Sequence, residues 1–456
     1  MVQANTWLVG PTRNYKKPSS VSTLVQNSDT VAIDAGIYLS DTARWSANNL
    51  VLKGVGGMAH LKANGASFGG KAIWVITGNN ILVQYIEFSL CTCASKNGAG
   101  IRQEGINLTV QHCYFHDNEN GILAGDNVTS NIVIEYSEFY NNGFGDGYTH
   151  NLYINHVNSL LFQYNYSHHA VVGHELKSRA YNNYILYNRI ANEATGNASR
   201  NIDLPNGGLA IVIGNEIHQG TLTQNSNMVG YGLEGLTNPT EHQFYFVNNT
   251  LVNEHTTAIF VSVQNSTALC KMTNNIFAGN GSVLSGTSLA IDTSHNLHSS
   301  FSGIGIANAS AYDYHLLTTS CAINKGISPG FAGAFSLYPI FEYIHPFSKL
   351  MRANNDTIDI GAHEFGASSN IKSEPLETVV SIIYPNPAAE FITVDLIGFF
   401  EQQKCLEILD MKGSLVYKLQ TFERRIIIPT QQLCRGVYLL KVIMEGISST
   451  QRFVIK

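Results

Sequence analysis

The stretch Asn131-Ile-Val-Ile-Glu-Tyr136 is a short alternating strand, and it belongs to a pattern that recurs along most of the chain. Each recurrence has an apolar residue, one or two others, a small or polar residue that serves as a marker, and then a bulky residue. The markers are Ile86, Cys113, Ser137, Asn165, Asn188, Asn215, Asn249, Asn275 and Asn296, on average about 26 residues apart. A repeat of this period indicates a solenoid.

The repeat predicts a parallel β-helix. Leucine-rich repeats need a leucine framework that this chain lacks, and a β-propeller blade needs about 40 residues or more. In a β-helix each turn stacks on the last at strand spacing. The six consecutive asparagines from Asn165 to Asn296 fit an internal ladder of side-chain amides, which is a structural role. We therefore predict an all-β chain in which residues 1–365 form a β-helix of about ten to eleven turns.

Two stretches resemble those of secreted bacterial right-handed parallel β-helix proteins. Ser28-Asp-Thr-Val-Ala-Ile33 with Gly36-Ile-Tyr38 is similar to their first coil. Tyr312-Asp-Tyr-His-Leu316, Ala322-Ile-Asn-Lys-Gly326 and Asp359-Ile-Gly-Ala-His-Glu-Phe365 are similar to their closing coil. The resemblance implies a right-handed β-helix that ends near residue 366.

Composition limits the classes of function. Charged residues are only 13% of the chain, the net charge is −6 and there is no basic stripe, which argues against nucleic acid. No apolar run approaches the ~18–20 residues of a transmembrane helix. The seven cysteines have no metal-type spacing, and the sequence does not show whether the chain binds a metal. Met1-Val-Gln-Ala4 does not look like a signal peptide, and we expect the sequence to be a mature or shortened form of a secreted protein.

The pattern changes after residue 365. Residues 366–377 form a polar linker. Residues 378–456 then hold seven short strands with turns such as Tyr384-Pro-Asn-Pro387 and Asp410-Met-Lys-Gly413, which predicts a small antiparallel β-sandwich. With Gly436-Val-Tyr-Leu-Leu-Lys-Val442 and Arg452-Phe-Val-Ile-Lys456, these motifs resemble the C-terminal sorting domain of the Bacteroidota type IX secretion system. The resemblance implies the secretion machinery as a partner and a secreted or outer-surface location; an ordinary accessory sandwich is the alternative.

One group of strands carries polar residues at positions predicted to face outward. The strands are Gly121-Ile-Leu-Ala-Gly125, Asn151-Leu-Tyr-Ile-Asn155, Glu175-Leu-Lys-Ser-Arg179, Asn201-Ile-Asp-Leu-Pro205 and Ala258-Ile-Phe-Val-Ser262. Their second and fourth residues should face the core, so the first, third and fifth should face solvent. The middle column then reads Leu123, Tyr153, Lys177, Asp203 and Phe260, flanked by Asn151, Glu175 and Asn201 on one side and by Asn155 and Arg179 on the other. We call the outward residues of the middle three strands the plate.

Positive charge gathers at the plate. Between Arg102 and Lys271 the only lysines and arginines are Lys177, Arg179, Arg189 and Arg200. This gathering favours an anionic partner, although surface salt bridges to Glu175, Glu193 and Asp203 are an alternative. Other candidates near the plate are His174, Asn206 in the bend after Asp203, and Glu234, while Tyr231 belongs either to the rim of a groove or to the core.

Lys177-Ser178 resembles the Lys-Ser pair of the β-helix polysaccharide lyase family that contains alginate lyases and chondroitinase B. The resemblance implies that Lys177 is a base, and the family uses an arginine of the next coil as the acid. In this chain the neighbour of Lys177 in that coil is Asp203, with Arg200 out of line. The family's calcium-binding carboxylate pair is missing except for Glu175, so the sequence requires no cofactor and calcium stays an open alternative.

Three functions follow from these residues. The first is a polysaccharide lyase acting on an acidic glycan by β-elimination, in which Arg179 and Arg200 hold the carboxylate, Lys177 is the base and Tyr153 the acid. The second is a glycoside hydrolase with Glu175 and Asp203 as its carboxylate pair. The third is a glycan-binding adhesin that stacks Tyr153, Phe260 and Tyr231 on sugars. We assign substrate contacts to Arg179, Arg200, Asn151, Asn155, His174, Asn206 and Glu234, and expect a monomer.

Overall fold

The computed structural model describes residues 4–353, 357–366, 380–384, 388, 390–397, 404–410, 414–423, 425–444 and 447–455. The chain divides into two compact units, Met1–Ala367 and Ser368–Lys456. The predicted linker beyond Gly366 lies outside the described residues, as do 385–387 and 411–413 of the two predicted turns. In the part of the chain that the structure describes, no helix is long and apolar enough to span a membrane.

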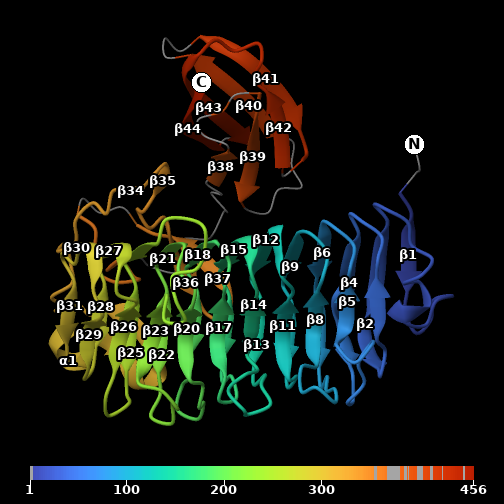
Figure 1. Ribbon diagram of the computed structural model, residues 1–456, viewed down its shortest axis with the longest axis horizontal. Coiled ribbons are helices and arrows are strands. Elements are labelled where there is room, and N and C mark those ends of the chain that lie inside the picture. Colours follow the sequence, from blue (N-terminus) through green and yellow to red (C-terminus); the bar gives the residue numbers. More distant parts are fainter. Residues whose placement is uncertain are drawn as a thin grey trace. The chain divides into compact units, whose positions relative to one another are not determined.

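The first unit is a right-handed parallel β-helix, which confirms the predicted fold class (Figure 1). Each coil gives one strand to each of three faces, and every strand pairs in parallel with the equivalent strand of the next coil. In Figure 1 the strands of successive coils stand side by side along the long axis, from blue to orange. Stacking of this kind keeps any one repeat position in a straight column, at about 4.8 Å per coil.

Face 1 holds ten strands, β3 (Ala43–Trp45), β5 (Ala72–Ile76), β8 (Ala99–Gln103), β11 (Asn120–Ala124), β14 (Leu152–Ile154), β17 (His174–Ser178), β20 (Arg200–Leu204), β23 (Asn227–Tyr231), β26 (Ile259–Val263) and β29 (Ser282–Ser285). Face 2 holds β6 (Ile81–Gln84), β9 (Leu108–Gln111), β12 (Asn127–Glu135), β15 (Val157–Gln163), β18 (Asn182–Leu186), β21 (Leu209–Ile213), β24 (Gln243–Val247), β27 (Thr267–Thr273) and β30 (Ser288–Asp292). Face 3 holds β7 (Ile86–Ser89), β10 (Tyr114–His116), β13 (Glu138–Tyr140), β16 (Tyr166–His168), β19 (Arg189–Ala191), β22 (Glu216–Gln219), β25 (Thr250–Asn253), β28 (Ile276–Ala278) and β31 (Leu297–Ser299).

The first coils are less regular. They contain β1 (Thr6–Val9), the 3₁₀ turn η1 (Pro18–Ser20), and the long strands β2 (Thr30–Leu39) and β4 (Val51–Lys62). β4 pairs with β6 through its first part and with β7 through its last part, so it runs through faces 2 and 3 without a break.

The corner between faces 2 and 3 is built in the same way in each later coil. The residue before each marker has a left-handed backbone, with φ from 50° to 68° between Tyr85 and His295. For a residue other than glycine this conformation costs about 1–2 kcal/mol. The bulky corner residues offset part of that cost by stacking on one another. The ring centroids of successive corner residues lie 4.9–5.1 Å apart along the column Tyr85, His112, Tyr136 and Tyr164.

The asparagine ladder is confirmed, and it satisfies the backbone at this corner. The Oδ1 of Asn188 accepts hydrogen bonds from the backbone N–H and the Nδ2 of Asn165, at 2.9 and 3.2 Å. Its Nδ2 donates to Phe162 O at 2.8 Å and to Asn215 Oδ1 at 2.9 Å. The same bonds continue through Asn249 and Asn275 to Asn296. One side chain per coil therefore links three coils.

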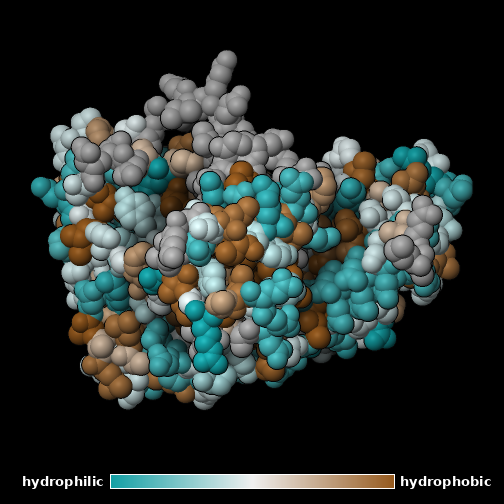
Figure 2. Space-filling view, turned by 90° about the horizontal axis from the view of Figure 1, so that it is seen from above, coloured by the Kyte–Doolittle hydropathy of each residue, from teal (hydrophilic) through white to brown (hydrophobic). Residues whose placement is uncertain are grey.

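The interior of the β-helix is a stack of apolar side chains. Phe88, Phe115 and Phe139 stack with their ring centroids 4.9 Å apart, and Trp74 packs edge-on against Phe88. Full burial of such a side chain contributes about 1.5–3 kcal/mol. On the outside, hydrophilic and apolar residues are interspersed (Figure 2).

Residues 301–366 do not continue the parallel coils. They form α1 (Phe301–Ile304), β32 (Ile306–Asn308), the 3₁₀ turn η2 (Ala309–Ala311), β33 (Asp313–Leu316), β34 (Phe331–Ala332), β35 (Phe335–Ser336), β36 (Phe341–Ile344) and β37 (Ser348–Met351). The strands pair antiparallel as β32–β33, β34–β35 and β36–β37. Contacts such as Arg189 Nη1 to Tyr312 O (3.1 Å) and Asn248 Nδ2 to Asp359 O (2.9 Å) hold the segment against earlier coils. The sequence predicted a closing coil here and did not predict that the segment packs back against earlier coils, because the marker pattern ends at Asn296.

The second unit holds two antiparallel sheets, as predicted. One contains β38 (Val380–Tyr384), β39 (Phe391–Ile397) and β42 (Arg425–Pro429), and the other contains β40 (Lys404–Asp410), β41 (Leu415–Thr421), β43 (Gly436–Met444) and β44 (Ile447–Ile455). Ile392 and Val394 of the first sheet share an apolar core with Leu406, Leu440 and Phe453 of the second.

Replacing Asn188 with leucine should destabilise the β-helix by about 2–4 kcal/mol, because Asn165 N–H, Phe162 O and the amide of Asn215 lose buried partners. A denaturant titration of the parent and Asn188→Leu measures the difference. Asn158→Leu is the matched control, since Asn158 is exposed on β15, and should cost less than about 0.5 kcal/mol. Equal stability of the two variants would contradict the structural role of the ladder.

Candidate functional site

The central column of the plate lies on face 1 in the predicted register. Leu123 pairs with Tyr153, Tyr153 with Lys177, and Lys177 with Asp203 on neighbouring strands. The next residue in the column is Gly230 of β23, and Ser262 of β26 follows it. Phe260, which we expected on the outside, is fully buried in the core, because the register of β26 places Ser262 in this column instead.

The prediction for one flank of the plate is wrong, because its three residues do not face solvent. Asn151, Glu175 and Asn201 are buried. They lie where the chain turns from face 3 into face 1, and simple strand alternation fails at that corner. Glu175 accepts hydrogen bonds from Asn151 Nδ2 at 2.6 Å and from Ala170 N at 3.1 Å, and its burial raises the pKa of the carboxyl well above the usual range. Glu175 therefore closes a buried corner, and the predicted pair of exposed carboxylates with Asp203 is not formed.

Lys177 is the centre of an ionic network on the plate. Its Nζ lies 3.3 Å from Asp203 Oδ2 and 2.7 Å from Glu234 Oε1. Arg200 Nη1 lies 2.7 Å from the other oxygen of Asp203. Asp203 is fully buried, whereas 11% of the Lys177 side chain and 45% of the Glu234 side chain are exposed. Glu234 thus covers the lysine amine from the solvent side.

Arg179 connects this network to the opposite end of the plate. Its Nη2 lies 2.5 Å from Glu234 Oε2, its Nε donates to Tyr153 OH at 3.0 Å, and its Nη1 donates to Asn206 Oδ1. Asn206 is itself oriented by a hydrogen bond from its Nδ2 to Thr237 Oγ1 at 2.8 Å. Asn155, at the end of β14, is half-buried and accepts a hydrogen bond from His156 N at 2.9 Å.

Glu234 comes from the loop after β23, in the longest interval of the repeat. Its backbone N–H donates to Pro205 O at 2.9 Å, which fixes the loop beside the plate. Burial opposes its ionisation, but hydrogen bonds from Lys177 and Arg179 lower the pKa of Glu234 to about 2. Tyr231, which the sequence analysis placed either at the rim of a groove or in the core, is fully buried in the core.

A pair of imidazoles borders the network. His174 Nε2 lies 3.5 Å from Asp203 Oδ2, and the ring of His150 stacks on His174 with centroids 4.8 Å apart. Burial, followed by the charge of Lys177, lowers the pKa of His174 to about 3, so the ring is neutral at neutral pH. The sequence analysis did not place His150 beside the plate. Its distance along the chain from His174 equals one coil, and this interval could have predicted that the two rings stack.

Three of the four clustered cations meet on the plate and one does not. Lys177, Arg179 and Arg200 face two carboxylates, Asp203 and Glu234, so these five groups carry one uncompensated positive charge. Arg189 lies on face 3, where it pairs with Glu193 at 3.0 Å and Glu216 at 3.4 Å. The expected ion pairs with Glu193 and Asp203 are formed, but Asp203 is buried and not at the surface, and no described ion pair involves Glu175. The plate keeps an excess charge suited to one anionic group.

Comparison with known proteins identifies the second unit. No curated protein sequence matches the chain. The crystal structure of pectate lyase Pel9A is similar to this chain at 13% sequence identity, with a TM-score of 0.45, over 79% of this chain and 96% of that one. Residues 382–456 match the family model of the secretion system C-terminal sorting domain. The chain therefore carries a secretion system C-terminal sorting domain, which follows the β-helix in the sequence.

Proposed function

We propose that this protein is a secreted polysaccharide lyase that cleaves an acidic glycan by β-elimination at the plate. The observation that carries the proposal is the position of Lys177 between Tyr153 and Asp203, with Arg179 bonded to the Tyr153 hydroxyl. The arrangement offers a base, an acid and an anion-binding guanidinium within neighbouring strands, which are the groups that elimination from a uronate requires.

Elimination needs the C5 proton removed while the sugar carboxylate is neutralised. Arg179 and Arg200 would bind that carboxylate, and the charge developing on it in the transition state would strengthen the interaction. Lys177 Nζ would take the C5 proton, the C4–O bond would break, and a C4–C5 double bond would form. Tyr153 would give its hydroxyl proton to the leaving oxygen, and Arg179 would stabilise the negative charge left on the phenol oxygen.

Lys177 acts as a base only when its amine is neutral. In the structure Glu234 pairs with both Lys177 and Arg179. A substrate carboxylate that takes the place of Glu234 on Arg179 would leave Lys177 without its partly exposed carboxylate partner. Glu234 would then no longer cover the lysine amine, and the C5 proton of the substrate could approach Lys177 Nζ.

Calcium has no step in this proposal. Calcium takes about six to eight oxygen ligands in proteins. The two carboxylates nearest Lys177 are Asp203 and Glu234, and each already pairs with two of the cations Lys177, Arg179 and Arg200. These residues do not fit a calcium ion.

The alternatives receive less support from the described residues. The hydrolase alternative loses Glu175, which is buried. The adhesin alternative keeps only Tyr153 of its three stacking aromatics, because Tyr231 and Phe260 are fully buried.

Lys177→Ala should lower turnover about 10²–10⁴-fold on a polyuronate that the parent cleaves, while substrate still binds. Lys177→Arg should not restore turnover, because a guanidinium stays protonated. Steady-state rates give turnover, and equilibrium binding to the same glycan gives affinity. Lys271→Ala is the matched control, since Lys271 pairs with Asp292 at 2.7 Å on face 2, away from the plate. Normal turnover by Lys177→Ala would refute the proposed base.

Arg179→Ala should instead weaken binding of the glycan, with an effect that depends on ionic strength because the lost contact is ionic. Affinity measured at low and high salt checks this, and Arg44→Ala, which removes an exposed arginine elsewhere on face 1, is the control. Unchanged affinity in Arg179→Ala would show that the carboxylate binds elsewhere.

We also propose that the second unit directs export by type IX secretion machinery, as the match over residues 382–456 supports. Deletion of 378–456 should leave a folded β-helix trapped in the periplasm of a suitable host. Circular dichroism of the truncated protein checks folding, and cell fractionation checks location. Arrival of the truncated protein at the cell surface would contradict a sorting role.

A further inference from the structure

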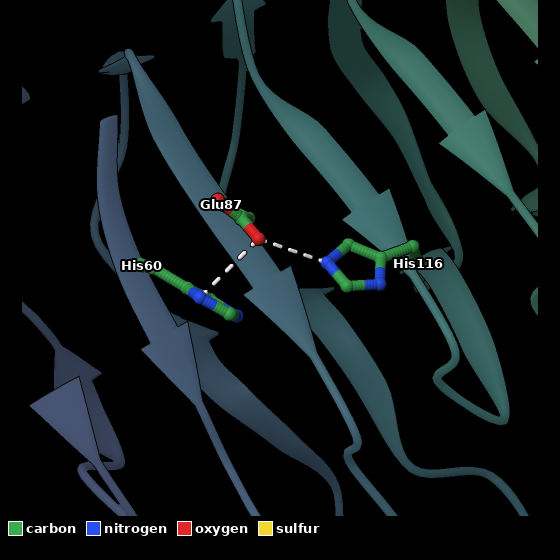
Figure 3. A group of neighbouring side chains, drawn as sticks. All are labelled: His60, Glu87 and His116. Carbon is green, nitrogen blue, oxygen red and sulfur yellow. Dashed lines mark hydrogen bonds and ion pairs between the residues drawn. The ribbon is translucent and has the colours of Figure 1, made fainter. Parts of the chain in front are cut away.

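We propose that His60, Glu87 and His116 form a zinc site that ties three successive coils of the β-helix together. The three residues lie on β4, β7 and β10 of face 3, on the outer side of the β-helix (Figure 3). This site lies on coils before the plate and does not depend on the proposed lyase activity.

The geometry of the three side chains suits one metal ion. Their ligand atoms all lie within 4.8 Å of one another. Glu87 Oε1 lies 3.2 Å from His60 Nδ1 and 3.0 Å from His116 Nε2, and Figure 3 shows both rings turned toward this carboxylate oxygen. Two ligands about 2.0–2.1 Å from a tetrahedral zinc lie roughly 3.3 Å apart. The two distances to Glu87 Oε1 are within a few tenths of an ångström of this value, and the two ring nitrogens, which lie within 4.8 Å of each other, would move closer together to bind the same ion.

The other nitrogen of each ring already has a partner of the kind that metal-binding histidines use. His116 Nδ1 lies 2.7 Å from Asp117 Oδ2, and Asp117 is held by Asn141 Nδ2 at 2.6 Å. His60 Nε2 lies 2.7 Å from Ser89 Oγ. Such outer contacts fix the ring orientation and leave Nδ1 of His60 and Nε2 of His116 as the ligating atoms.

The ligand set and its exposure favour zinc. Two imidazoles and one carboxylate suit zinc, with a fourth position left for water. The His60, Glu87 and His116 side chains are 16%, 23% and 16% exposed, so a hydrated ion can reach them. Magnesium and calcium prefer all-oxygen ligands and should not bind here.

Two other His/Glu groups among the described residues are less suited to a cation. In the group of His168, His169 and Glu193, the carboxylate pairs with Arg189 at 3.0 Å. In the group of His315, Glu342 and His363, the imidazole of His363 lies between Glu342 and Glu216, at 3.3 and 2.7 Å. Arg189 would compete with a metal ion for Glu193, and His363 is held by Glu216 from outside its group, whereas in the described contacts Glu87 pairs only with the two histidines of its own group.

Zinc at this site would link β4, β7 and β10, which are neighbours along the direction in which the coils stack. Residues 60, 87 and 116 lie in coils separated by 27 and 29 positions of the chain. An ion that binds all three only in the folded state stabilises that state, by an amount that grows with the logarithm of the zinc concentration above Kd.

The test uses the untagged full chain, stripped of metal with a chelator, and follows thermal unfolding during titration with zinc chloride. Zinc should raise the Tm of the parent, whereas magnesium chloride should leave it unchanged. Cobalt chloride should give the visible absorption of a tetrahedral site. His60→Ala and His116→Ala should lose both responses, while His298→Ala, which removes an exposed histidine from β31 on the same face, should keep them.

Ser89→Ala separates a metal site from an ordinary histidine–glutamate contact. It leaves all three ligands in place and removes only the hydroxyl group beside His60 Nε2, so it should weaken zinc binding about 10–100-fold. The proposal is overturned if zinc leaves the Tm of the parent unchanged, or if His60→Ala and His116→Ala respond to zinc and cobalt as the parent does.

Discussion

The structure depends on the hydrogen bonds that one asparagine side chain per coil, from Asn165 to Asn296, makes to the corners of the neighbouring coils. Asn165, Asn188 and their successors satisfy the buried backbone groups of a left-handed corner that would otherwise be costly. Because each amide bonds in both directions, the corner of one coil fixes the corner of the next. The three faces and the register of every column on them follow from that alignment.

The plate shows what such alignment does to charged residues. Side chains at one repeat position are forced to within roughly 5 Å of each other, so a lysine in the column needs an acid in the next coil. Asp203 supplies it from the neighbouring strand, and Glu234 supplies a second from the long loop. Asp203 is fully buried, whereas 45% of the Glu234 side chain is exposed, so in the proposed mechanism Glu234 is the acid that gives way to a substrate anion. On this account the difference in burial between Asp203 and Glu234 is what makes the network reactive.

Much of this arrangement could be predicted from the sequence because a strict repeat carries positional information. The marker column gave the coil length, the ladder and the Tyr153–Lys177–Asp203 alignment. Alternation failed at Glu175 because this second residue of β17 still lies beside the corner between faces 3 and 1 and turns inward. It failed at Phe260 because the number of residues between the marker and the strand of face 1 varies from coil to coil, being 12 from Asn165 to Lys177 but 15 from Asn188 to Asp203, so the marker does not fix which residue of β26 faces outward. His60, Glu87 and His116 carried no local motif, since only the stacking of three coils brings them together.

The claim that the plate performs β-elimination is tested most directly with the parent protein and a panel of acidic polysaccharides. The ultraviolet absorbance of unsaturated uronate and the number of new reducing ends are recorded in the same reaction. The account predicts that both rise together in equal molar amounts on at least one polyuronate. Reducing ends without the absorbance would mean hydrolysis, and neither signal on any acidic glycan would mean that the plate cleaves none of them; either result would contradict the account.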